Sequence, residues 1–423
     1  MPTTTTSDRA RVLVLGAGFA GLSAVRHLVG TEMDVTIVDQ HNFHTFQPLL
    51  YQVATAGLEP ADVAYPVRTV FGRAPNVTFR HARVDAIDLA GRTVTTSEGD
   101  RLAYDALVVA TGAVVAHFGV PGAAEHALPL YTLRDARRLR NRLLSVLEEA
   151  DAHPERHDDG APVFVVVGGG PTGVETAGAL VELLEVVITR DRLRIDPTRS
   201  KVVLVDGADR LLGPFRPEAS RYAADTLRSR RVDVRLGCQV ASVDASSVTL
   251  ADGTTLRADV VVWAAGVAVE PTAAGLGGTR GRVAVEPNLS LKAHPEVFVV
   301  GDAAAVPIGP GLGRCAQVAQ VAIQSGRHAA RELRRRANGE PARAFRYVDK
   351  GIMAAIGRRA AVAQLRVGPV IRGTLGWLAW LGLHLVYLIG FRNRLRVLVN
   401  WWWRYVDWPS GPRLIVADAE SEP

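Results

Sequence analysis

The sequence VLVLGAGFAG, residues 12–21, decides the fold, because an apolar strand runs directly into a GxGxxG turn. A helical segment follows at residues 22–28, and a second apolar strand at 35–38 ends at Asp39. Strand, glycine-rich turn, helix, strand and acid are the parts of a dinucleotide-binding βαβ unit. In such a unit the first glycine permits the tight turn, the second lets the backbone approach a pyrophosphate, and the third lets the helix pack on the strand.

The same unit occurs a second time. Residues 163–173, VFVVVGGGPTG, again run from an apolar strand into a glycine-rich turn, and a helical segment follows at 174–184. A second strand at 202–205 ends at Asp206. One GxGxxG alone is weak evidence, because glycine-rich turns are common. Two of them in strand–turn–helix context, each with a downstream acid, predict two dinucleotide sites.

The two units also end alike. Residues 105–112, DALVVATG, and residues 259–266, DVVVWAAG, each run from an acidic residue through an apolar strand to a glycine. The opening glycines of the two units are 152 positions apart, and their closing glycines are 154 apart. A repeat that stays in register at both ends indicates two copies of one α/β domain.

Two dinucleotide sites in one chain suggest two nucleotides that exchange electrons. NAD(P)H with FAD is the pairing that does this, because hydride passes directly from nicotinamide to flavin. Asp39 stands 23 residues after its first glycine, the expected spacing for a ribose-binding acid, whereas Asp206 stands 38 residues after its own, behind an inserted polar run at 190–200. An acid at Asp206 repels a 2′-phosphate, which predicts NADH over NADPH, although Arg210 lies nearby in sequence.

Length and composition are those of a multidomain globular protein. The chain has 423 residues, 48% hydrophobic and 22% charged, which suggests two or three domains. The net charge of +6 is small and identifies no partner by itself. Cys238 and Cys315 lie far apart in sequence, so neither a disulfide framework nor a metal site is expected. Residues 1–11 lack the apolar core of a signal peptide, and we expect the body of the protein to stay in the cytoplasm.

Five further segments carry a resemblance to a known family. They are residues 42–54 (NFHTFQPLLYQVA), 110–112 (ATG), 297–304 (VFVVGDAA), 319–326 (AQVAIQSG) and 345–358 (FRYVDKGIMAAIGR). With the two glycine-rich units, they make nearly the whole chain resemble the type II NADH dehydrogenases, the single-subunit NADH:quinone oxidoreductases within the two-dinucleotide-binding-domain flavoproteins. Disulfide reductases of this superfamily carry a cysteine pair where this chain has residues 42–54. No cysteine stands there, which excludes thiol chemistry at that position.

The resemblance implies bound FAD, NADH as co-substrate, a quinone as electron acceptor, and no metal. For FAD it implies contacts from Gly16, Gly18, Phe19, Ala20, Gly21, Asp39, Gln40, His44, Phe46, Gln47, Pro48, Leu49, Val84, Ala110, Thr111, Gly112, Gly301, Asp302, Ala319, Gln320 and Val321. For NADH it implies contacts from Gly168, Gly170, Pro171, Thr172, Gly173, Glu175, Asp206, Ala265 and Gly266. Asp302 is expected to accept hydrogen bonds from the ribityl chain.

Four residues are candidates for chemistry on the quinone side. Gln320 and Gln324 are four positions apart and share a helix face, and the resemblance places them at the quinone entrance, where amide donors suit carbonyl groups. Lys350 matches a family lysine near the quinone end of the flavin, and Glu175 matches a family acid that can pass a proton. Each also has a purely structural interpretation. Gln320 and Gln324 would be a polar stripe on a surface helix, and Lys350 would form a solvated pair with Asp349. Glu175 would be an acid that interacts favourably with the dipole of a first helical turn.

The C-terminal region combines apolar, basic and aromatic segments. Residues 374–390 carry no formal charge, residues 391–396 contain three arginines, and six of the seven tryptophans lie between Trp377 and Trp408. The apolar run is short for a membrane span, whereas tryptophan, tyrosine and arginine favour the headgroup region. We therefore expect an in-plane anchor that inserts one face. The rival interpretations are a transmembrane hairpin and a dimer interface that buries the aromatic side chains.

The predicted fold is an α/β protein with two Rossmann-like, glutathione-reductase-like domains and a C-terminal membrane-associated helical region. We expect an FAD-binding domain at residues 9–123 and 267–335, an NADH-binding domain at 124–266, and a quinone-site and membrane-anchoring region at 336–423.

The expected function is that of an NADH:quinone oxidoreductase that does not pump ions. The protein would be peripheral on the cytoplasmic face of the cell membrane and would bind no nucleic acid. Because family members often dimerise, a homodimer is also compatible with the resemblance. Three alternatives stay open. A sulfide:quinone oxidoreductase shares the fold but needs paired cysteines beside the flavin. An NADH-dependent reductase would use an acceptor other than quinone, and an NADH sensor would bind flavin without turnover.

Overall fold

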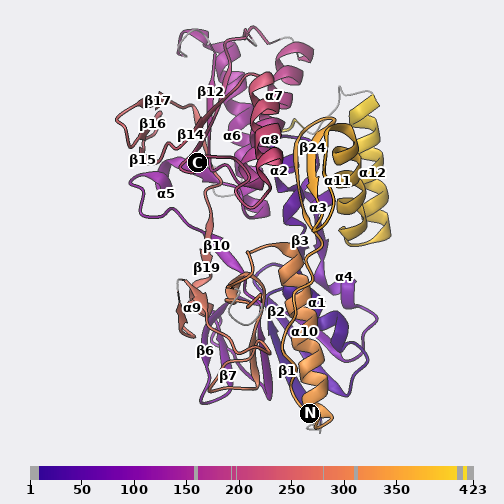
Figure 1. Ribbon diagram of the computed structural model, residues 1–423. Helices are drawn as coiled ribbons and strands as arrows, with labels where there is room; N and C mark the ends of the chain where they lie inside the picture. Colours follow the sequence, from indigo (N-terminus) through magenta and orange to yellow (C-terminus); the bar gives the residue numbers. More distant parts are fainter. Residues whose placement is uncertain are drawn as a thin grey trace. The chain divides into compact units, whose positions relative to one another are not determined.

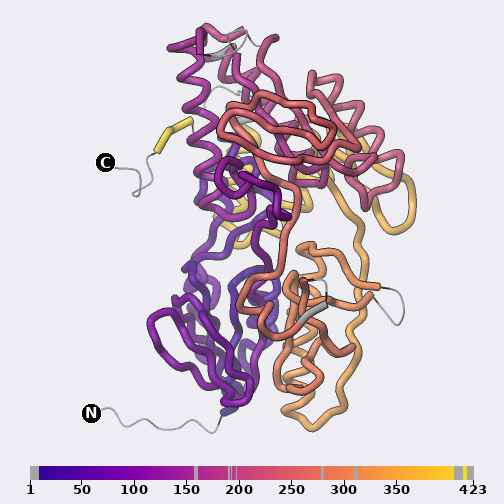
Figure 2. Tube along the Cα trace, turned by 90° about the vertical axis from the view of Figure 1, so that its left-hand side faces the viewer, coloured from indigo at the N-terminus to yellow at the C-terminus, as the bar shows by residue number. Residues whose placement is uncertain are grey.

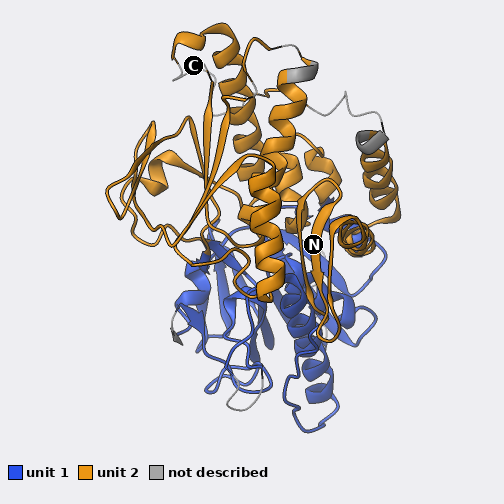
Figure 3. Ribbon diagram, turned by 45° about the horizontal axis from the view of Figure 1, so that its top comes forward, with its two compact units in different colours: residues 1–44, 65–114, 267–349 blue, residues 45–64, 115–266, 350–423 orange. Residues whose placement is uncertain are grey.

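The structure, a computed structural model, describes residues 9–156, 161–191, 193–196, 198–279, 281–308, 313–406 and 413–416 (Figure 1). The chain divides into two compact units, which Figure 3 shows in different colours. Unit 1 comprises residues 1–44, 65–114 and 267–349, and unit 2 comprises residues 45–64, 115–266 and 350–423. The three-region division expected from the sequence stays a prediction.

Unit 1 is built on a five-stranded parallel sheet. In spatial order its strands are β22 (Val297–Val299), β9 (Ala106–Val109), β1 (Ala10–Leu15), β2 (Met33–Asp39) and β5 (Val77–His81). Residues 12–15 of the central strand are buried, as expected where helices cover both faces of a parallel sheet. Helix α1 (Phe19–Leu28) follows β1 and lies beside α10 (Ala319–Ala337) (Figure 1). An antiparallel ribbon of β6 (Val84–Asp88), β7 (Thr93–Thr96) and β8 (Arg101–Ala103) completes the repeat.

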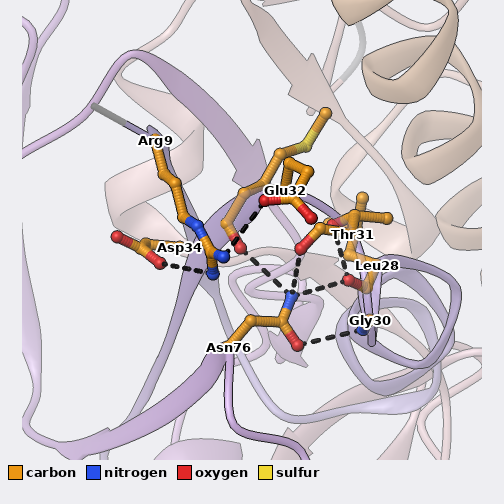
Figure 4. A network of polar contacts seen from close by, with 8 residues as sticks. Arg9, Leu28, Gly30, Thr31, Glu32, Asp34 and Asn76 are labelled. Carbon is orange, nitrogen blue, oxygen red and sulfur yellow. Dashed lines mark hydrogen bonds and ion pairs between the residues drawn. The ribbon is translucent and has the colours of Figure 1, made fainter. Parts of the chain in front are cut away.

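Asn76 fixes the turn between α1 and β2. Its amide nitrogen donates to the carbonyl oxygens of Leu28, at 2.9 Å, and Met33, at 3.1 Å, and its Oδ1 accepts the N–H of Gly30 at 3.0 Å (Figure 4). The last carbonyls of a helix have no partner within it, so this buried amide replaces the missing bonds. The side chain thereby secures the C-terminal end of α1, the helix that carries the glycine-rich turn at its other end.

Unit 2 contains the second copy of the same design. Its parallel sheet has the order β11 (Ala127–Pro129), β18 (Val260–Trp263), β12 (Val163–Val167), β13 (Lys201–Asp206) and β14 (Val232–Leu236). The helices are α6 (Leu133–Ala152), α7 (Pro171–Arg190) and α8 (Pro217–Ser229). The antiparallel ribbon is β15 (Val240–Val243), β16 (Ser247–Leu250) and β17 (Thr255–Arg257). The prediction of two Rossmann-like sheets is confirmed, because both are parallel and equivalent strands occupy equivalent places.

The C-terminal part of unit 2 is a small antiparallel sheet followed by two helices. The strands are β23 (Ile352–Gly357), β24 (Ala360–Gln364) and β25 (Val370–Arg372), and the helices are α11 (Gly373–Tyr387) and α12 (Phe391–Val406). Strand β23 packs on α7 so closely that a Cβ on Gly178 would collide with the carbonyl oxygen of Ile356. Within the described ranges, no helix has the length and apolar character needed to cross a membrane.

A short stretch near the end of the chain returns to α6. The side-chain amide of Asn141 donates to the carbonyl of Val416 at 2.6 Å and accepts the N–H of the same residue at 3.3 Å. Figure 2 shows this stretch, residues 413–416, as a yellow segment beside the purple helix. The two bonds satisfy both backbone groups of Val416, so the stretch is held to α6 through its main chain.

Candidate functional site

The glycine-rich turn of unit 1 has the backbone that a nucleotide pyrophosphate needs. Gly16 has a φ of +101°, and a Cβ there would collide with the carbonyl oxygen of Ala110 at the end of β9. A Cβ on Gly21 would collide with the carbonyl of Gly16, so α1 packs directly on the turn. Gly18 differs, because a Cβ there would meet nothing within 4 Å. Its small size leaves space above the N-terminus of α1, where an anion binds favourably.

The turn of unit 2 repeats this geometry position by position. Gly168 has a φ of +115°, and a Cβ there would collide with the carbonyl of Ala264 at the end of β18. A Cβ on Gly173 would collide with Gly168, whereas a Cβ on Gly170 would meet nothing within 4 Å. Pro171 begins α7 and Thr172 follows in its first turn. The two turns therefore present the same open surface at the start of a helix.

The two strand-terminal acids have equivalent orientations. Asp39 accepts the backbone N–H of Ala17 at 2.6 Å, in the glycine-rich turn of unit 1. Asp206 accepts the backbone N–H of Gly169, in the turn of unit 2, and that of Ala208 at 2.6 Å. Each carboxylate is thus held beside its own nucleotide turn. The long spacing that made Asp206 uncertain in the sequence comes mainly from α7, which has 20 residues where α1 has 10. The run expected at residues 190–200 explains only the rest, as a longer connection before β13.

Buried polar atoms in unit 1 fit a bound flavin nucleotide. Nδ1 of His44 donates to the carbonyl of Ala17 at 2.9 Å, and Nε2 is buried without a hydrogen-bond partner among the described residues. Burial lowers the pKa of His44 to about 4, so the imidazole is neutral and Nε2 is an acceptor. Oγ1 of Thr111 is likewise buried and unpaired within the described part of the chain. Unpaired buried polar atoms are rare and costly, and a nucleotide with donors and acceptors would satisfy both.

Asp302 lies at the same edge of the unit 1 sheet. It follows β22 in the short helix η4 (Gly301–Ala303), next to the end of β9 and the Ala110–Gly112 turn in the strand order. Burial raises the pKa of Asp302 to about 6, opposed by the charge of Arg282. The N–H of Gly301 donates to Oγ of Ser325 on α10 at 3.0 Å, which ties this turn to the helix. The carboxyl ends of adjacent parallel strands thus bring the three glycine-containing turns to one edge, where open α/β sheets bind ligands.

The remaining sequence-predicted cofactor residues fall in both units. In unit 1 the structure places Phe19 and Ala20 in the first turn of α1, Gln40 directly after β2, Val84 at the start of β6, and Ala319, Gln320 and Val321 at the start of α10. In unit 2 it places Phe46 with Gln47, Pro48 and Leu49 of the short helix η1 (Gln47–Leu49), and Ala265 and Gly266 after β18. The segment predicted to run along the flavin is therefore shared between the units, which divide after His44.

Glu175 is a buried acid on α7. Its Oε1 accepts the backbone N–H of Ala355 on β23 at 3.1 Å and the indole N–H of Trp380 on α11 at 3.2 Å. Burial raises the pKa of Glu175 to about 8, although both hydrogen bonds oppose the rise. The carboxyl is consequently protonated at neutral pH, unlike an acid that only favours the dipole of a first helical turn. It lines a small pocket whose walls belong to unit 2.

Aromatic side chains surround Glu175 from the C-terminal side. The ring of Trp380 stacks on His384 with centroids 4.1 Å apart, and contacts the rings of Tyr51 and Trp401 at 6.2 and 6.1 Å. The indole N–H of Trp401 donates to Oε1 of Gln52 at 2.8 Å. The sequence did not identify these residues as surroundings of Glu175, since an apolar aromatic run does not show which of its side chains face inward.

The other quinone-side candidates have defined partners. Gln324 on α10 uses both ends of its amide on Val348: Nε2 donates to the carbonyl at 2.9 Å and Oε1 accepts the N–H at 3.0 Å. Lys350 donates to the hydroxyl of Tyr387 on α11 at 3.4 Å. Gln320 and Gln324 belong to unit 1, whereas Glu175 and Lys350 belong to unit 2. Each of these two pairs is therefore described within its own unit.

The C-terminal helices have one buried and one exposed face. Trp377, Trp380 and Trp401 are buried in unit 2, so part of the aromatic run expected at a membrane surface is core. Trp408 lies outside the described residues. The exposed large apolar side chains of the two helices and the turn between them are Leu375, Leu378, Leu383, Val386, Phe391, Leu395, Leu398, Val399, Trp402 and Trp403.

Asp62 fastens α12 to the rest of unit 2. It is fully buried on α3 (Pro60–Val63), where Oδ2 accepts the amide of Asn400 at 2.9 Å and Oδ1 lies 3.2 Å from the guanidinium of Arg396. Its carbonyl oxygen accepts the amide of Asn393 at 2.8 Å. Asp62 thus has three partners on one helix, two at its carboxylate and one at its carbonyl oxygen, and together they fix the orientation of that helix. Nothing in the sequence around Asp62 singled it out.

Comparison with known proteins defines the class. A family model described as pyridine nucleotide-disulphide oxidoreductase matches residues 10–326. The structure of NDH2 from Plasmodium falciparum in complex with NADH superposes with a TM-score of 0.85, at 17% identity, and covers 96% of this chain and all of that one. The sulfide:quinone oxidoreductase of Aquifex aeolicus superposes with a TM-score of 0.73 at 18% identity, over 91% and 92% of the two chains, which shows a shared fold alone. The chain belongs to the pyridine nucleotide-disulphide oxidoreductase family.

Sequence relatives narrow the class. The type II NADH:quinone oxidoreductase NdhA of Mycobacterium tuberculosis is 42% identical over 93% of this chain and 86% of its own length. The relative Ndh of the same organism is 38% identical over 99% and 93%, and that of Staphylococcus haemolyticus is 30% identical over 84% and 89%. Within the family the chain belongs to the type II NADH:quinone oxidoreductases, which confirms the predicted resemblance and function.

Proposed function

We propose that this chain binds FAD in the Rossmann half of unit 1 and NADH at the glycine-rich turn of unit 2, and reduces a quinone delivered from a membrane. FAD, when bound, accepts a hydride from NADH and passes two electrons to the quinone. The unpaired buried atoms of His44 and Thr111 carry the assignment of FAD to unit 1. NADH is then assigned to unit 2, whose glycine-rich turn has an equivalent open glycine and an equivalent acid at the end of the second strand.

Asp206 supports NADH over NADPH. Its carboxylate is oriented by two backbone N–H groups beside the turn, so a 2′-phosphate would meet a fixed negative charge. Arg210 does not offset this charge, since its guanidinium donates to the carbonyl of Gly213 in its own loop at 2.7 Å. A kcat/KM for NADPH equal to that for NADH would refute this assignment.

Glu175 is proposed as a proton carrier for quinone reduction. A carboxyl with a pKa of about 8 holds a proton at neutral pH and releases it readily. The reaction needs such a group, because NADH supplies two electrons and one proton as a hydride, whereas a quinol contains two electrons and two protons more than the quinone. Gln320, Gln324 and Lys350 are proposed to position the quinone, with Gln324 acting on the backbone of Val348 and Lys350 held at Tyr387.

The exposed faces of α11 and α12 are proposed to attach the protein to a membrane. Phe391 is 81% exposed and Trp402 60% exposed, in a region that also carries Arg392, Arg394 and Arg396. Apolar and indole side chains with adjacent arginines favour an anionic bilayer surface. We propose peripheral attachment on the cytoplasmic face of the cell membrane, with dimerisation through the same region as a compatible use of the surface.

Vesicle sedimentation tests the attachment, and a quinone assay tests the reaction. Trp402→Ser with Trp403→Ser is expected to reduce binding to anionic vesicles at least about tenfold, because two indoles leave the interface. Val367→Ser is the matched control, since Val367 is 80% exposed but lies outside both helices. Equal loss in the control, or no loss in the double variant, would refute attachment through α12. Steady-state NADH oxidation with several quinones, with and without lipid, tests the activity independently.

A further inference from the structure

Helix α10 carries a stripe of arginines beside the end of α1. Arg327, Arg331 and Arg334, here called the arginine stripe, are four and seven positions apart, so their side chains share one face of the helix. Helix α1 lies alongside in the same unit and has Arg26 and His27 in its last turn (Figure 1). The sequence of α10 contains five arginines and one glutamate, and that of α1 contains no acid. This part of unit 1 therefore concentrates positive charge.

The imidazole of His27 shows that the arginine stripe converges on one place. Nδ1 of the ring donates to the carbonyl of Ser23 at 2.8 Å, which holds the ring against its own helix. Burial lowers the pKa of His27, the bond to Ser23 opposes this, and the charges of all three stripe arginines lower the pKa further. The three guanidinium groups thus act on one partly buried ring at the end of α1.

The arginine stripe has no countercharge within the described part of the chain. No described residue forms a hydrogen bond or an ion pair with its guanidinium groups, and Nε of Arg327 is buried without an acceptor. Arg335, on another face of α10, differs, because it lies 3.9 Å from Glu332 and 3.0 Å from Glu340. Like charges three or four positions apart destabilise a helix, so an anion bound at the stripe would relieve this repulsion.

The helix dipole explains only part of the stripe. Arginines in the last turn interact favourably with the carbonyl end of a helix, which accounts for residues 334–336. This effect is confined to the last turn, whereas Arg327 and Arg331 stand ten and six positions before Ala337, the residue at which α10 ends. Two of the three stripe arginines therefore need another explanation.

We propose that the arginine stripe, together with His27, is a binding site for a compact, multiply charged phosphate group. Guanidinium groups present paired N–H donors in one plane, which match the oxygens of a phosphate. Partly buried Arg327 would form the floor of the site, and exposed Arg331 and Arg334 would form its rim. The inference goes beyond the proposed function, because neither electron transfer from NADH nor quinone reduction requires this site.

The site is separate from the glycine-rich turn of unit 1. His27 stands nine positions after Gly18, the residue that precedes α1, which corresponds to about 14 Å along the helix axis. A pyrophosphate bound at the N-terminus of α1 would therefore not neutralise the arginine stripe at the other end of the helix.

Calorimetric titration with tripolyphosphate tests the site. FAD-loaded protein is titrated at low salt with saturating NAD⁺, so that dinucleotides compete for both glycine-rich turns. The wild type is expected to bind one tripolyphosphate per chain. Arg327→Gln with Arg331→Gln is expected to weaken this binding at least about tenfold, because two of the three guanidinium groups are lost. The exposed pair Arg331→Gln with Arg334→Gln is the second variant if the first does not fold.

Arg335→Gln with Arg336→Gln is the matched control. It removes the same charge from the same helix but leaves the arginine stripe intact, so affinity should fall by less than about twofold. Tripolyphosphate should also raise the Tm of the wild type and the control, but not that of the stripe variant, because only a ligand of the folded state stabilises it.

The outcomes decide both the site and the source of the phosphate. Absence of binding by the wild type, or equal loss in the control, would overturn the proposal, and tighter binding of a polyglutamate peptide would overturn the assignment to phosphate. Vesicles with phosphatidic acid identify the source. Weaker vesicle binding by the stripe variant than by the control assigns the site to a lipid headgroup, whereas equal binding assigns it to a soluble phosphate compound, and the site stands in both cases.

Discussion

The carboxyl of Glu175 is expected to make folding stability depend on pH. Burial raises its pKa from 4.5 to about 8 in the folded protein. Below pH 4.5 the group is protonated in both the folded and the unfolded states, so its burial costs no ionisation. Above pH 8 it is ionised in both states and the full cost applies, so stability is lost as pH rises through this window. The loss totals about 5 kcal/mol, of which about 3 kcal/mol falls between pH 6 and pH 9.

Glu175→Gln isolates this contribution. The amide oxygen of glutamine can still accept the N–H groups of Ala355 and Trp380, but the side chain does not ionise. Urea unfolding of the FAD-loaded wild type and variant at four pH values from 6 to 9 measures the difference, and contributions from other groups cancel. The variant is expected to gain about 3 kcal/mol relative to wild type over this range. Parallel stability curves for the two proteins would show that Glu175 has an ordinary pKa and would refute the reasoning.

Three further predictions follow from other parts of the molecule. Gly18→Ala is expected to fold, since its Cβ meets no protein atom within 4 Å, but to lose FAD affinity, because the Cβ enters the space above the N-terminus of α1. Gly21→Ala should instead destabilise unit 1 through its collision with the Gly16 carbonyl. Equilibrium dialysis measures the first effect and thermal unfolding the second. Arg396→Ala should cost about 3 kcal/mol in urea unfolding, because it leaves the fully buried carboxylate of Asp62 without its countercharge, against about 1 kcal/mol for Asp62→Asn, which removes the buried charge itself; equal costs would contradict this. Asp206→Ala should lower the NADH:NADPH ratio of kcat/KM at least about tenfold, and an unchanged ratio would place coenzyme selection elsewhere.

The sequence predicts the parts of this fold that depend on local backbone chemistry. The glycines at 16 and 168 adopt positive φ, as strand–turn–helix patterning implies, and Asp39 and Asp206 lie at the strand ends beside their own turns. The repeat in register predicts two parallel sheets, and both are present. These features follow from short stretches of chain, so a single sequence contains the information.

The sequence does not predict contacts made over long separations. Asp62 and Asn400 are 338 positions apart, and Gln52 and Trp401 are 349 apart. The C-terminal tryptophans illustrate the difference: composition suggests a membrane surface for all of them, but Trp377, Trp380 and Trp401 fill the space beside α7 and α2 (Leu50–Ala54). Only the packing partners decide which indoles are core. The same holds for Glu175, whose burial comes from β23 and α11 rather than from its own helix.

Quinol formation on vesicles tests the central claim most directly. Purified, FAD-loaded protein is bound to anionic vesicles with and without a dissolved quinone, and NADH oxidation, quinol formation and internal pH are followed together. We predict one quinol for each NADH, no turnover in quinone-free vesicles, and no change in the internal pH. NADH oxidation at the same rate without quinone, or NADH binding without turnover, would contradict an enzyme that delivers electrons from NADH to an acceptor in the lipid.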